Sequence, residues 1–279
     1  MIDLSRNEKS VFDLVLKNKN EKFLYYKKMD TGVHSNVYLL NNKYIIKFNN
    51  KVTIKGEKIF FKNNISKYNE TILFYDDNND EYIVYNYIDN DNIEKEKINI
   101  ERLKSNMKGY ISSYRECDWN GYGYLFEEKK TWSDFFESEM TWRKQYAFEV
   151  LNKSEYNKVE KAISVLDKYP VNKVILHGDL GIHNLLFKNN NLVGIIDPQP
   201  IAGDRIYDYI FFIFSDLIFC KDMTMLKLYD DLQKEATEKI DALVILVLFD
   251  RIIRCVRHKS NNTNEYLKLW KNYKNQINL

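Results

Sequence analysis

Three polar side chains in the second half of the chain have the types and spacing of a site that handles a metal and a hydroxyl group. Asp179 and Asn184 lie in a loop between two short apolar runs, and Asp197 directly follows a third. A tight Asn-rich turn at 189–191 would pair the last two runs and place Asn184 beside Asp197. Amide and carboxylate oxygens suit Mg²⁺, which keeps its other positions for water and phosphate. Asp179 would then face an incoming hydroxyl.

The elements around this loop follow from the apolar pattern. We expect short strands at 174–176, 185–187 and 192–196. A helix at 153–169 stops before Pro170, and the apolar stretches 207–220 and 241–258 read as buried helices. The loop that carries the three polar residues would therefore be held by strands inside a mainly helical region.

The N-terminal part reads differently. After a helix at 4–16, the pattern predicts strands and one short helix at 55–62. The expected strands lie at 23–28, 36–40, 43–48, 72–75 and 81–87, with a turn at Asn41–Asn42. The polar run 89–99 is the best linker. We therefore predict an α+β, bilobal protein: a small antiparallel-sheet lobe at 1–90, a larger helical lobe at 91–279, and a ligand cleft between them.

Bulk properties exclude several classes of protein. The chain has 279 residues, a formal net charge of +2 and only 3 Cys. A balanced charge does not suit a nucleic-acid-binding protein, and three widely spaced Cys residues do not suit a disulfide framework. No apolar segment is long enough to cross a bilayer, and the N-terminus shows no signal peptide. We expect a cytoplasmic protein with neither a membrane nor a nucleic-acid partner.

The motif HGDLGIHN resembles the HxDxxxxN catalytic loop of the aminoglycoside phosphotransferase and choline kinase family, whose members share the protein-kinase-like fold. Asp197 follows in IIDP, where that family has its second magnesium-binding aspartate. The tail IDPQPIAGDRIYD is similar to the streptomycin-type phosphotransferases. The resemblance implies ATP or GTP with Mg²⁺ as cofactors, Asp179 as the catalytic residue, and Asn184 and Asp197 as metal ligands.

The N-terminal lobe would then hold the nucleotide. Lys47 lies inside a strand where the family has its phosphate-binding lysine, and Glu57 is its expected partner, with Glu70 as a rival. The loop around Gly32 lies where a nucleotide loop belongs, although it lacks the protein-kinase GxGxxGxV pattern. The remaining nucleotide-binding assignments are Ser35, Asn86, Tyr87 and Ile88.

Several neighbours of the motif have an ordinary structural explanation. His177 is expected to brace the loop by hydrogen bonds, and His183 is given no role. Asp204 and Asp208 read as carboxylates at the start of a helix, and the resemblance adds a hydrogen bond back to the catalytic loop.

Three further groups of residues have two interpretations each. The triplet Arg251, Arg254 and Arg257 could bind an anion, but ion pairs with acids such as Asp250 explain it more simply. An aromatic group reads as core packing, although one member could wall a substrate pocket. An acidic group reads as a solvated face, although it could attract a cation. These groups are Trp132, Phe135, Phe136 and Trp142, and Glu127, Glu128, Asp134, Glu137 and Glu139.

The sequence thus predicts an ATP-dependent phosphotransferase acting on a hydroxyl of a small molecule, as a monomer or homodimer. The acceptor could be an aminoglycoside-type antibiotic or a housekeeping metabolite such as an amino alcohol or a sugar. From residue 101 onward there are 26 Lys plus Arg against 25 Asp plus Glu, which decides neither way. The alternative is a catalytically silent binding module of the same fold. A protein kinase is disfavoured because a buried helix follows Asp197 almost at once.

Overall fold

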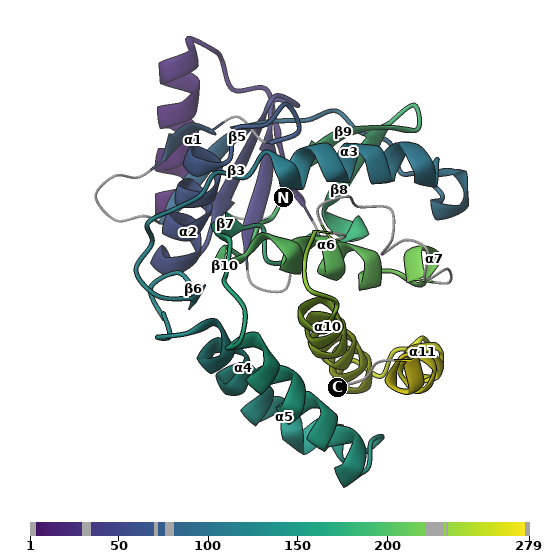
Figure 1. Cartoon of the computed structure of the whole chain (residues 1–279). Helices are drawn as coiled ribbons and strands as arrows, with labels where there is room; N and C mark the ends of the chain where they lie inside the picture. The colour runs from purple at the N-terminus through teal and green to yellow at the C-terminus, as the bar shows by residue number, and fades with distance from the viewer. Residues whose placement is uncertain are drawn as a thin grey trace.

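The computed structural model describes residues 4–29, 35–69, 72–75, 81–220, 232 and 234–276. It has a small lobe built on an antiparallel sheet and a larger, mainly helical lobe, so the predicted fold class is confirmed (Figure 1). The predicted lobe boundary at 90/91 falls in the irregular segment between the last strand of that sheet and the first helix of the larger lobe. Gly32 and Glu70 lie outside the described residues.

Every strand pair of the five-stranded sheet is antiparallel, and three of its four pairs join strands that are consecutive along the chain. The turn at Asn41 and Asn42 has φ of 52° and 53°, the left-handed geometry of a tight two-residue hairpin loop. The predicted strand at 23–28 begins only at Tyr26 and runs to Met29. In spatial order β1-β2-β3-β5-β4, the strands are β1 (Tyr26–Met29), β2 (Asn36–Leu40), β3 (Tyr44–Phe48), β5 (Tyr82–Asn86) and β4 (Ile72–Tyr75).

Two helices cover the two faces of this sheet. Because side chains alternate along a strand, Tyr44 and Ile46 of β3 pack against α1 (Arg6–Lys19), while Lys47 points to the face of α2 (Lys51–Asn63). Helix α1 begins with a capping box between Ser5 and Glu8. The register of β3 thus directs Lys47 toward α2 and the larger lobe.

The strands of the larger lobe are short and hold the loop of the sequence motif. The turn at Asn189 and Asn190 has φ of 50° and 60°, as the predicted Asn-rich hairpin requires. One three-stranded sheet has the order β6-β10-β7, and β8 pairs with β9. Their bounds are β6 (Gly123–Tyr124), β7 (Lys173–Leu176), β8 (Leu185–Lys188), β9 (Asn191–Ile195) and β10 (Ile201–Asp204).

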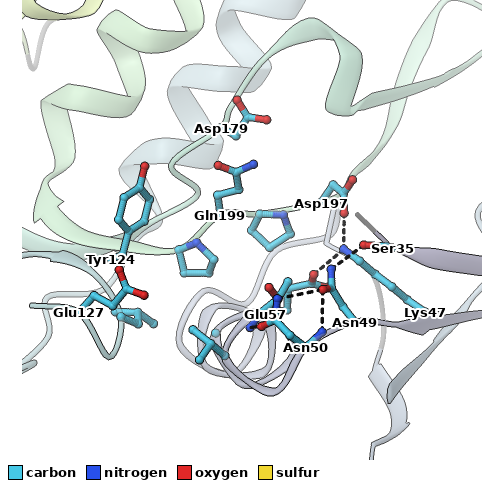
Figure 2. A pocket seen from close by; sticks show the side chains of 16 residues that line it. Ser35, Lys47, Asn49, Asn50, Glu57, Tyr124, Glu127, Asp179, Asp197 and Gln199 are labelled. Carbon is cyan, nitrogen blue, oxygen red and sulfur yellow. Dashed lines mark hydrogen bonds and ion pairs between the residues drawn. The ribbon is translucent and has the colours of Figure 1, made fainter. Parts of the chain in front are cut away.

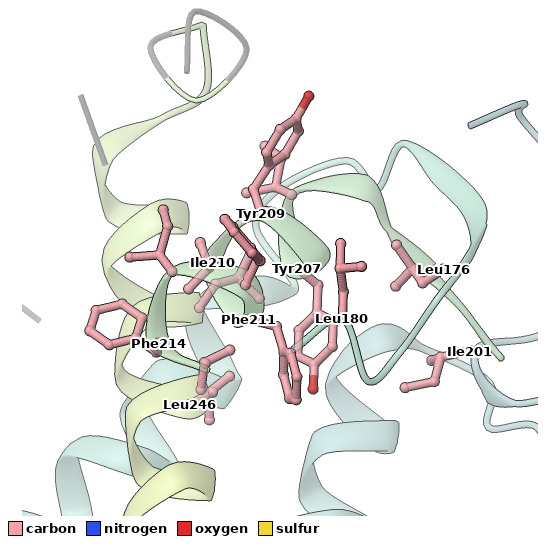
Figure 3. Packing of buried hydrophobic residues seen from close by; sticks show 14 of the residues in the cluster. Leu176, Leu180, Ile201, Tyr207, Tyr209, Ile210, Phe211, Phe214 and Leu246 are labelled. Carbon is pink, nitrogen blue, oxygen red and sulfur yellow. The ribbon is translucent and has the colours of Figure 1, made fainter. Parts of the chain in front are cut away.

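Helices form the rest of the larger lobe. The apolar helix α6 (Arg205–Phe214) is buried along most of its length and packs against α10 (Thr237–Arg257), with Phe211, Phe214 and Leu246 in the shared core (Figure 3). The expected single helix at 207–220 is interrupted at Ser215 and Asp216, so that prediction was wrong in extent. The helices are α3 (Ile100–Ser112), α4 (Trp132–Ala147), α5 (Lys153–Leu166), α6 (Arg205–Phe214), α7 (Leu217–Cys220), α10 (Thr237–Arg257) and α11 (Thr263–Gln276).

Helix α10 is the central element of the helical lobe and contacts α4, α5, α6 and α11 (Figure 1). The predicted linker at 89–99 carries one short 3₁₀ turn, Lys95–Lys97. None of the helices in the described part of the chain combines the length and apolar character needed to cross a membrane.

Candidate active site

A cleft of about 610 Å³ lies between α2 and β3 of the small lobe and the loop of the HGDLGIHN motif in the larger lobe, called the motif loop below (residues 177–184). This volume is in the range of small-molecule sites. Figure 2 shows Lys47, Ser35 and Asp197 at one end and Tyr124 and Glu127 at the other. The lining residues include Ser35, Lys47, Glu57, Tyr124, Asp179, Asp197 and Gln199.

Lys47 joins the two lobes at this cleft. Its ammonium donates to the carboxylates of Glu57 on α2 and Asp197 in the larger lobe. Tyr85 also donates to Glu57, at 2.6 Å, and this second bond holds the buried carboxylate in place. Burial lowers the pKa of Lys47, but the charges of Glu57 and Asp197 outweigh it and raise the pKa above its usual value. Lys47 therefore stays positively charged, and its predicted pairing with Glu57 is confirmed.

The motif loop is held in place by hydrogen bonds to a buried carboxylate. Asp208 at the start of α6 accepts hydrogen bonds from the backbone N–H groups of His177 and Gly178, at 2.8 and 3.1 Å. Gly178 has φ of +76°, and a Cβ there would lie 2.0 Å from the Gln199 carbonyl oxygen, so the position requires glycine. Burial raises the pKa of Asp208 to about 7 despite these bonds. The expected hydrogen bond from this carboxylate to the loop is confirmed.

His177 braces the loop, as predicted. Its ring is fully buried, with Nε2 3.0 Å from the Ile196 carbonyl oxygen and Nδ1 accepting the Asp179 N–H at 3.4 Å. Burial lowers the pKa of His177 to about 4, which keeps the ring neutral at physiological pH. Because Ile196 directly precedes Asp197, this ring links the loop that carries Asp179 to the segment that carries Asp197.

The two carboxylate oxygens of Asp179 have different surroundings. Oδ2 accepts hydrogen bonds from His183 Nε2 at 3.1 Å and Asn184 Nδ2 at 3.3 Å. Oδ1 is buried and receives no hydrogen bond from the described residues, and Arg254 approaches it at 3.7 Å. Burial raises the pKa of Asp179, but the hydrogen bond from His183 and the charges of His183 and Arg254 hold it below its usual value. An ionised carboxylate that lines the cleft can accept a hydroxyl proton.

Asn184 and Asp197 fit the predicted magnesium site. The Asn184 amide nitrogen is used by Asp179, and its amide oxygen receives no hydrogen bond from the described residues. The Asn184 carbonyl accepts the Ile196 N–H at 3.0 Å, which places Asn184 next to the segment carrying Asp197. The Asp197 side chain is 51% exposed in the cleft, and the residue has φ of +60°. The Asn184 amide oxygen and the Asp197 carboxylate oxygen that does not bind Lys47 are thus hard oxygens on neighbouring segments, of the kind that Mg²⁺ prefers, and magnesium binding by them stays a prediction.

The other assigned nucleotide-binding residues are only partly brought together. Ser35 lines the cleft and accepts a hydrogen bond from Asn49 at 2.6 Å. Asn86, Tyr87 and Ile88 are not among the residues that line it. The Tyr87 N–H already donates to the Lys43 carbonyl at 2.7 Å. Adenine binding by this segment stays a prediction.

Four residues near the site had no catalytic role in the sequence interpretation: His183, Arg254, Tyr124 and Gln199. His183 and Arg254 approach Asp179, while Tyr124 and Gln199 line the cleft. His183 follows Asp179 by four residues, a local spacing that could have signalled the contact. Arg254 comes from α10 and is brought close only by the tertiary fold. Asp204 caps α6 and pairs with Lys239 at 2.7 Å, which agrees with its predicted role as a helix cap.

The comparison with protein families agrees with this geometry. Residues 124–241, which contain the whole motif loop, match the model of the phosphotransferase enzyme family. The resemblance to the phosphotransferase family is confirmed. A comparison with curated protein sequences found no match.

Solved structures with the phosphotransferase fold resemble the whole chain at low sequence identity. A candidate fructosamine-3-kinase from Haemophilus somnus 129PT is 15% identical with a TM-score of 0.64, and the match covers 97% of both chains. The ternary complex of APH(2″)-IIa with streptomycin and ATP is 16% identical with a TM-score of 0.58, covering 96% of this chain and 97% of that one. A thermostable mutant of aminoglycoside phosphotransferase APH(4)-Ia, bound to ADP and hygromycin B, is 14% identical with a TM-score of 0.63, covering 95% and 97%. These similarities establish the fold.

Proposed function

We propose that the protein transfers the terminal phosphoryl group of ATP or GTP to a hydroxyl group of a small molecule. The observation that carries the proposal is the meeting of Lys47, Asp197 and Asp179 in one cleft between the lobes. The family match and the nucleotides named in the similar structures support it.

Each residue has a role that follows from its surroundings. Lys47, kept charged by Glu57 and Asp197, would neutralise the nucleotide phosphates from the small lobe. Asn184 and Asp197 would hold Mg²⁺, which when bound would offset negative charge on those phosphates. Ser35 would contact the nucleotide from the same end of the cleft.

Asp179 would orient the acceptor. Its carboxylate lines the cleft and can accept the hydroxyl hydrogen, while His183 and Asn184 fix its orientation through Oδ2. Phosphoryl transfer has a loose transition state, so positioning the hydroxyl in line contributes more than strong proton abstraction. A carboxylate with a lowered pKa is adequate for this role because the proton leaves late.

A screen of ATP consumption tests the proposal. Purified protein is incubated with ATP and Mg²⁺ and, separately, with aminoglycosides, streptomycin-like compounds, amino alcohols, sugars and hydroxy acids. We expect at least one hydroxyl compound to accelerate ATP consumption and to gain a phosphoryl group. Tight ATP binding without transfer to any compound would instead favour a silent binding module.

A further inference from the structure

A second, smaller cavity adjoins the catalytic cleft on the side away from Lys47. It has a volume of about 260 Å³ and lies between α4 and the C-terminal end of α10. We call it the arginine pocket because Arg143, Arg254 and Arg257 line it, together with Tyr124 and Trp142. Arg254 is half-buried and Arg257 is exposed, and both project from α10.

The arginine pocket opens toward the reacting end of the site. Tyr124 lines both this pocket and the catalytic cleft, and Figure 2 shows it at the end of the cleft opposite Asp197. Arg254 lines the pocket and approaches Asp179 Oδ1 at 3.7 Å. A molecule whose hydroxyl meets Asp179 can therefore extend into the arginine pocket while the nucleotide occupies the Lys47 end.

The carboxylates of Glu139 and Asp250 near the pocket already accept hydrogen bonds from arginine and tyrosine side chains. Glu139, the one carboxylate that lines it, pairs with Arg143 at 2.7 Å and accepts the Tyr124 hydroxyl at 3.2 Å. Asp250, buried behind it, accepts from Arg143 at 2.8 Å and from Arg254 Nε at 2.7 Å. These two carboxylates thus pair with Arg143 and Arg254, and Arg254 also faces a third carboxylate, that of Asp179, at 3.7 Å.

Arg257 is left unbalanced. It is exposed at the pocket, and it makes no ion pair with any residue in the described ranges. Its guanidinium lies over the Trp142 ring, 5.6 Å from the centroid. Trp142 is 39% exposed, so it presents both an apolar wall and a ring that orients the cation.

This charge pattern selects the acceptor. A polycation would meet Arg254 and Arg257, and Glu139, the carboxylate among the described residues that line the pocket, is already paired with Arg143; like charges brought together are costly. A carboxylate or phosphate, in contrast, matches the planar fork of a guanidinium through paired charge-assisted hydrogen bonds.

Building on the proposed phosphotransferase function, we propose that the arginine pocket binds an anionic group, a carboxylate or phosphate, on the acceptor molecule. Arg257 and Arg254 would hold the anion against Trp142, and the acceptor's hydroxyl would reach Asp179. The substrate class is then an anionic hydroxy compound rather than an aminoglycoside.

Calorimetry with inorganic phosphate as the probe tests the pocket directly. Saturating Mg-ADP is present so that the Lys47 end of the cleft is filled. We expect phosphate binding to weaken about tenfold in Arg257→Glu, which reverses the unbalanced charge, and to be largely kept in Arg257→Lys. Arg115→Glu is the matched control, since Arg115 is an exposed arginine that lines neither cavity, and its phosphate affinity should equal that of the wild type.

The outcomes separate this inference from the proposed function. Absent phosphate binding, or binding that Arg257→Glu leaves unchanged, overturns the anion site, whereas the phosphotransferase proposal depends only on transfer from ATP. In the ATP-consumption screen, faster turnover of gentamicin or streptomycin than of the hydroxy acids also overturns it. If no compound is phosphorylated but Arg257-dependent phosphate binding is observed, the anion site stands and the proposed reaction fails.

Discussion

At the scale of single residues, the catalytic assignment depends on the two oxygens of Asp179. His183 and Asn184 fix Oδ2, whereas Oδ1 is buried and receives no hydrogen bond from the described residues. Asp179→Asn keeps the shape and the buried volume but removes the acceptor charge. We expect turnover to fall about 10²–10⁴-fold with the KM for ATP nearly unchanged, as steady-state kinetics would show. Turnover within a few-fold of wild type would rule out the assigned role.

His177 gives a pH-dependent prediction. Its pKa is lowered to about 4 in the folded protein, from an ordinary value of 6.5. Between these values the unfolded chain binds a proton that the folded chain does not, so stability falls as the pH drops from about 6.5 to about 4. His177→Gln removes this proton uptake, and the wild type should lose up to about 3 kcal/mol relative to the variant across the window. Urea unfolding at several pH values measures it, and parallel pH profiles would contradict it.

The sequence was informative about residues that are close together along the chain. Asp179, Asn184, Asp197 and His177 lie within one stretch of 21 residues, so spacing and turn chemistry sufficed to group them. Arg254 could not be placed beside Asp179 in this way, because the contact depends on how α10 packs against α6.

At the scale of elements, the motif loop depends on the conformation of one glycine. In Gly178→Ala, the new Cβ would lie 2.0 Å from the Gln199 carbonyl oxygen, in a backbone conformation with φ of +76°. We expect this variant to be destabilised by roughly 1–3 kcal/mol and to lose most of its activity. Gly109 is the matched control: it lies inside α3 with no atom within 4 Å of an added Cβ.

Gly109→Ala should therefore raise the free energy of unfolding by roughly 0.5–1 kcal/mol and leave turnover unchanged. Thermal unfolding and activity assays on the two variants test both statements. Equal effects of the two substitutions would show that the loop does not need a left-handed residue at position 178.

The elements themselves were predictable to different degrees. Alternating and helical apolar patterns identified the five strands of the small lobe and helices α5 and α10, with ends displaced by a few residues. Helices α3, α4 and α11 were not predicted, although Leu103, Met107, Tyr110 and Ile111 of α3 recur at helical spacing. The break between α6 and α7 was also missed, since Ser215 and Asp216 lie in an otherwise apolar run.

At the scale of the whole molecule, the two lobes are joined at the cleft by the ion pair between Lys47 and Asp197. Lys47→Ala leaves the buried Glu57 and the exposed Asp197 without their shared cation. We expect ATP affinity and turnover each to fall by tenfold or more, corresponding to about 1.4 kcal/mol or more for each.

Lys43→Ala serves as the control for that substitution. Lys43 directly precedes the same strand, but its side chain is 58% exposed and pairs with Glu21 on the surface. Its replacement should change stability by at most about 1 kcal/mol and leave ATP binding intact. Similar losses in both variants would mean that general charge, and not the interlobe pair, determines nucleotide affinity.

The most direct test of the whole account is mass spectrometry of hydroxyl compounds incubated with the protein, ATP and Mg²⁺. We predict that at least one compound gains a single phosphoryl group with the wild type and that Asp179→Asn abolishes most of this transfer. Transfer that proceeds equally with Asp179→Asn, or ATP binding with no phosphorylated product from any compound, would contradict the assignment of this cleft as a phosphoryl-transfer site.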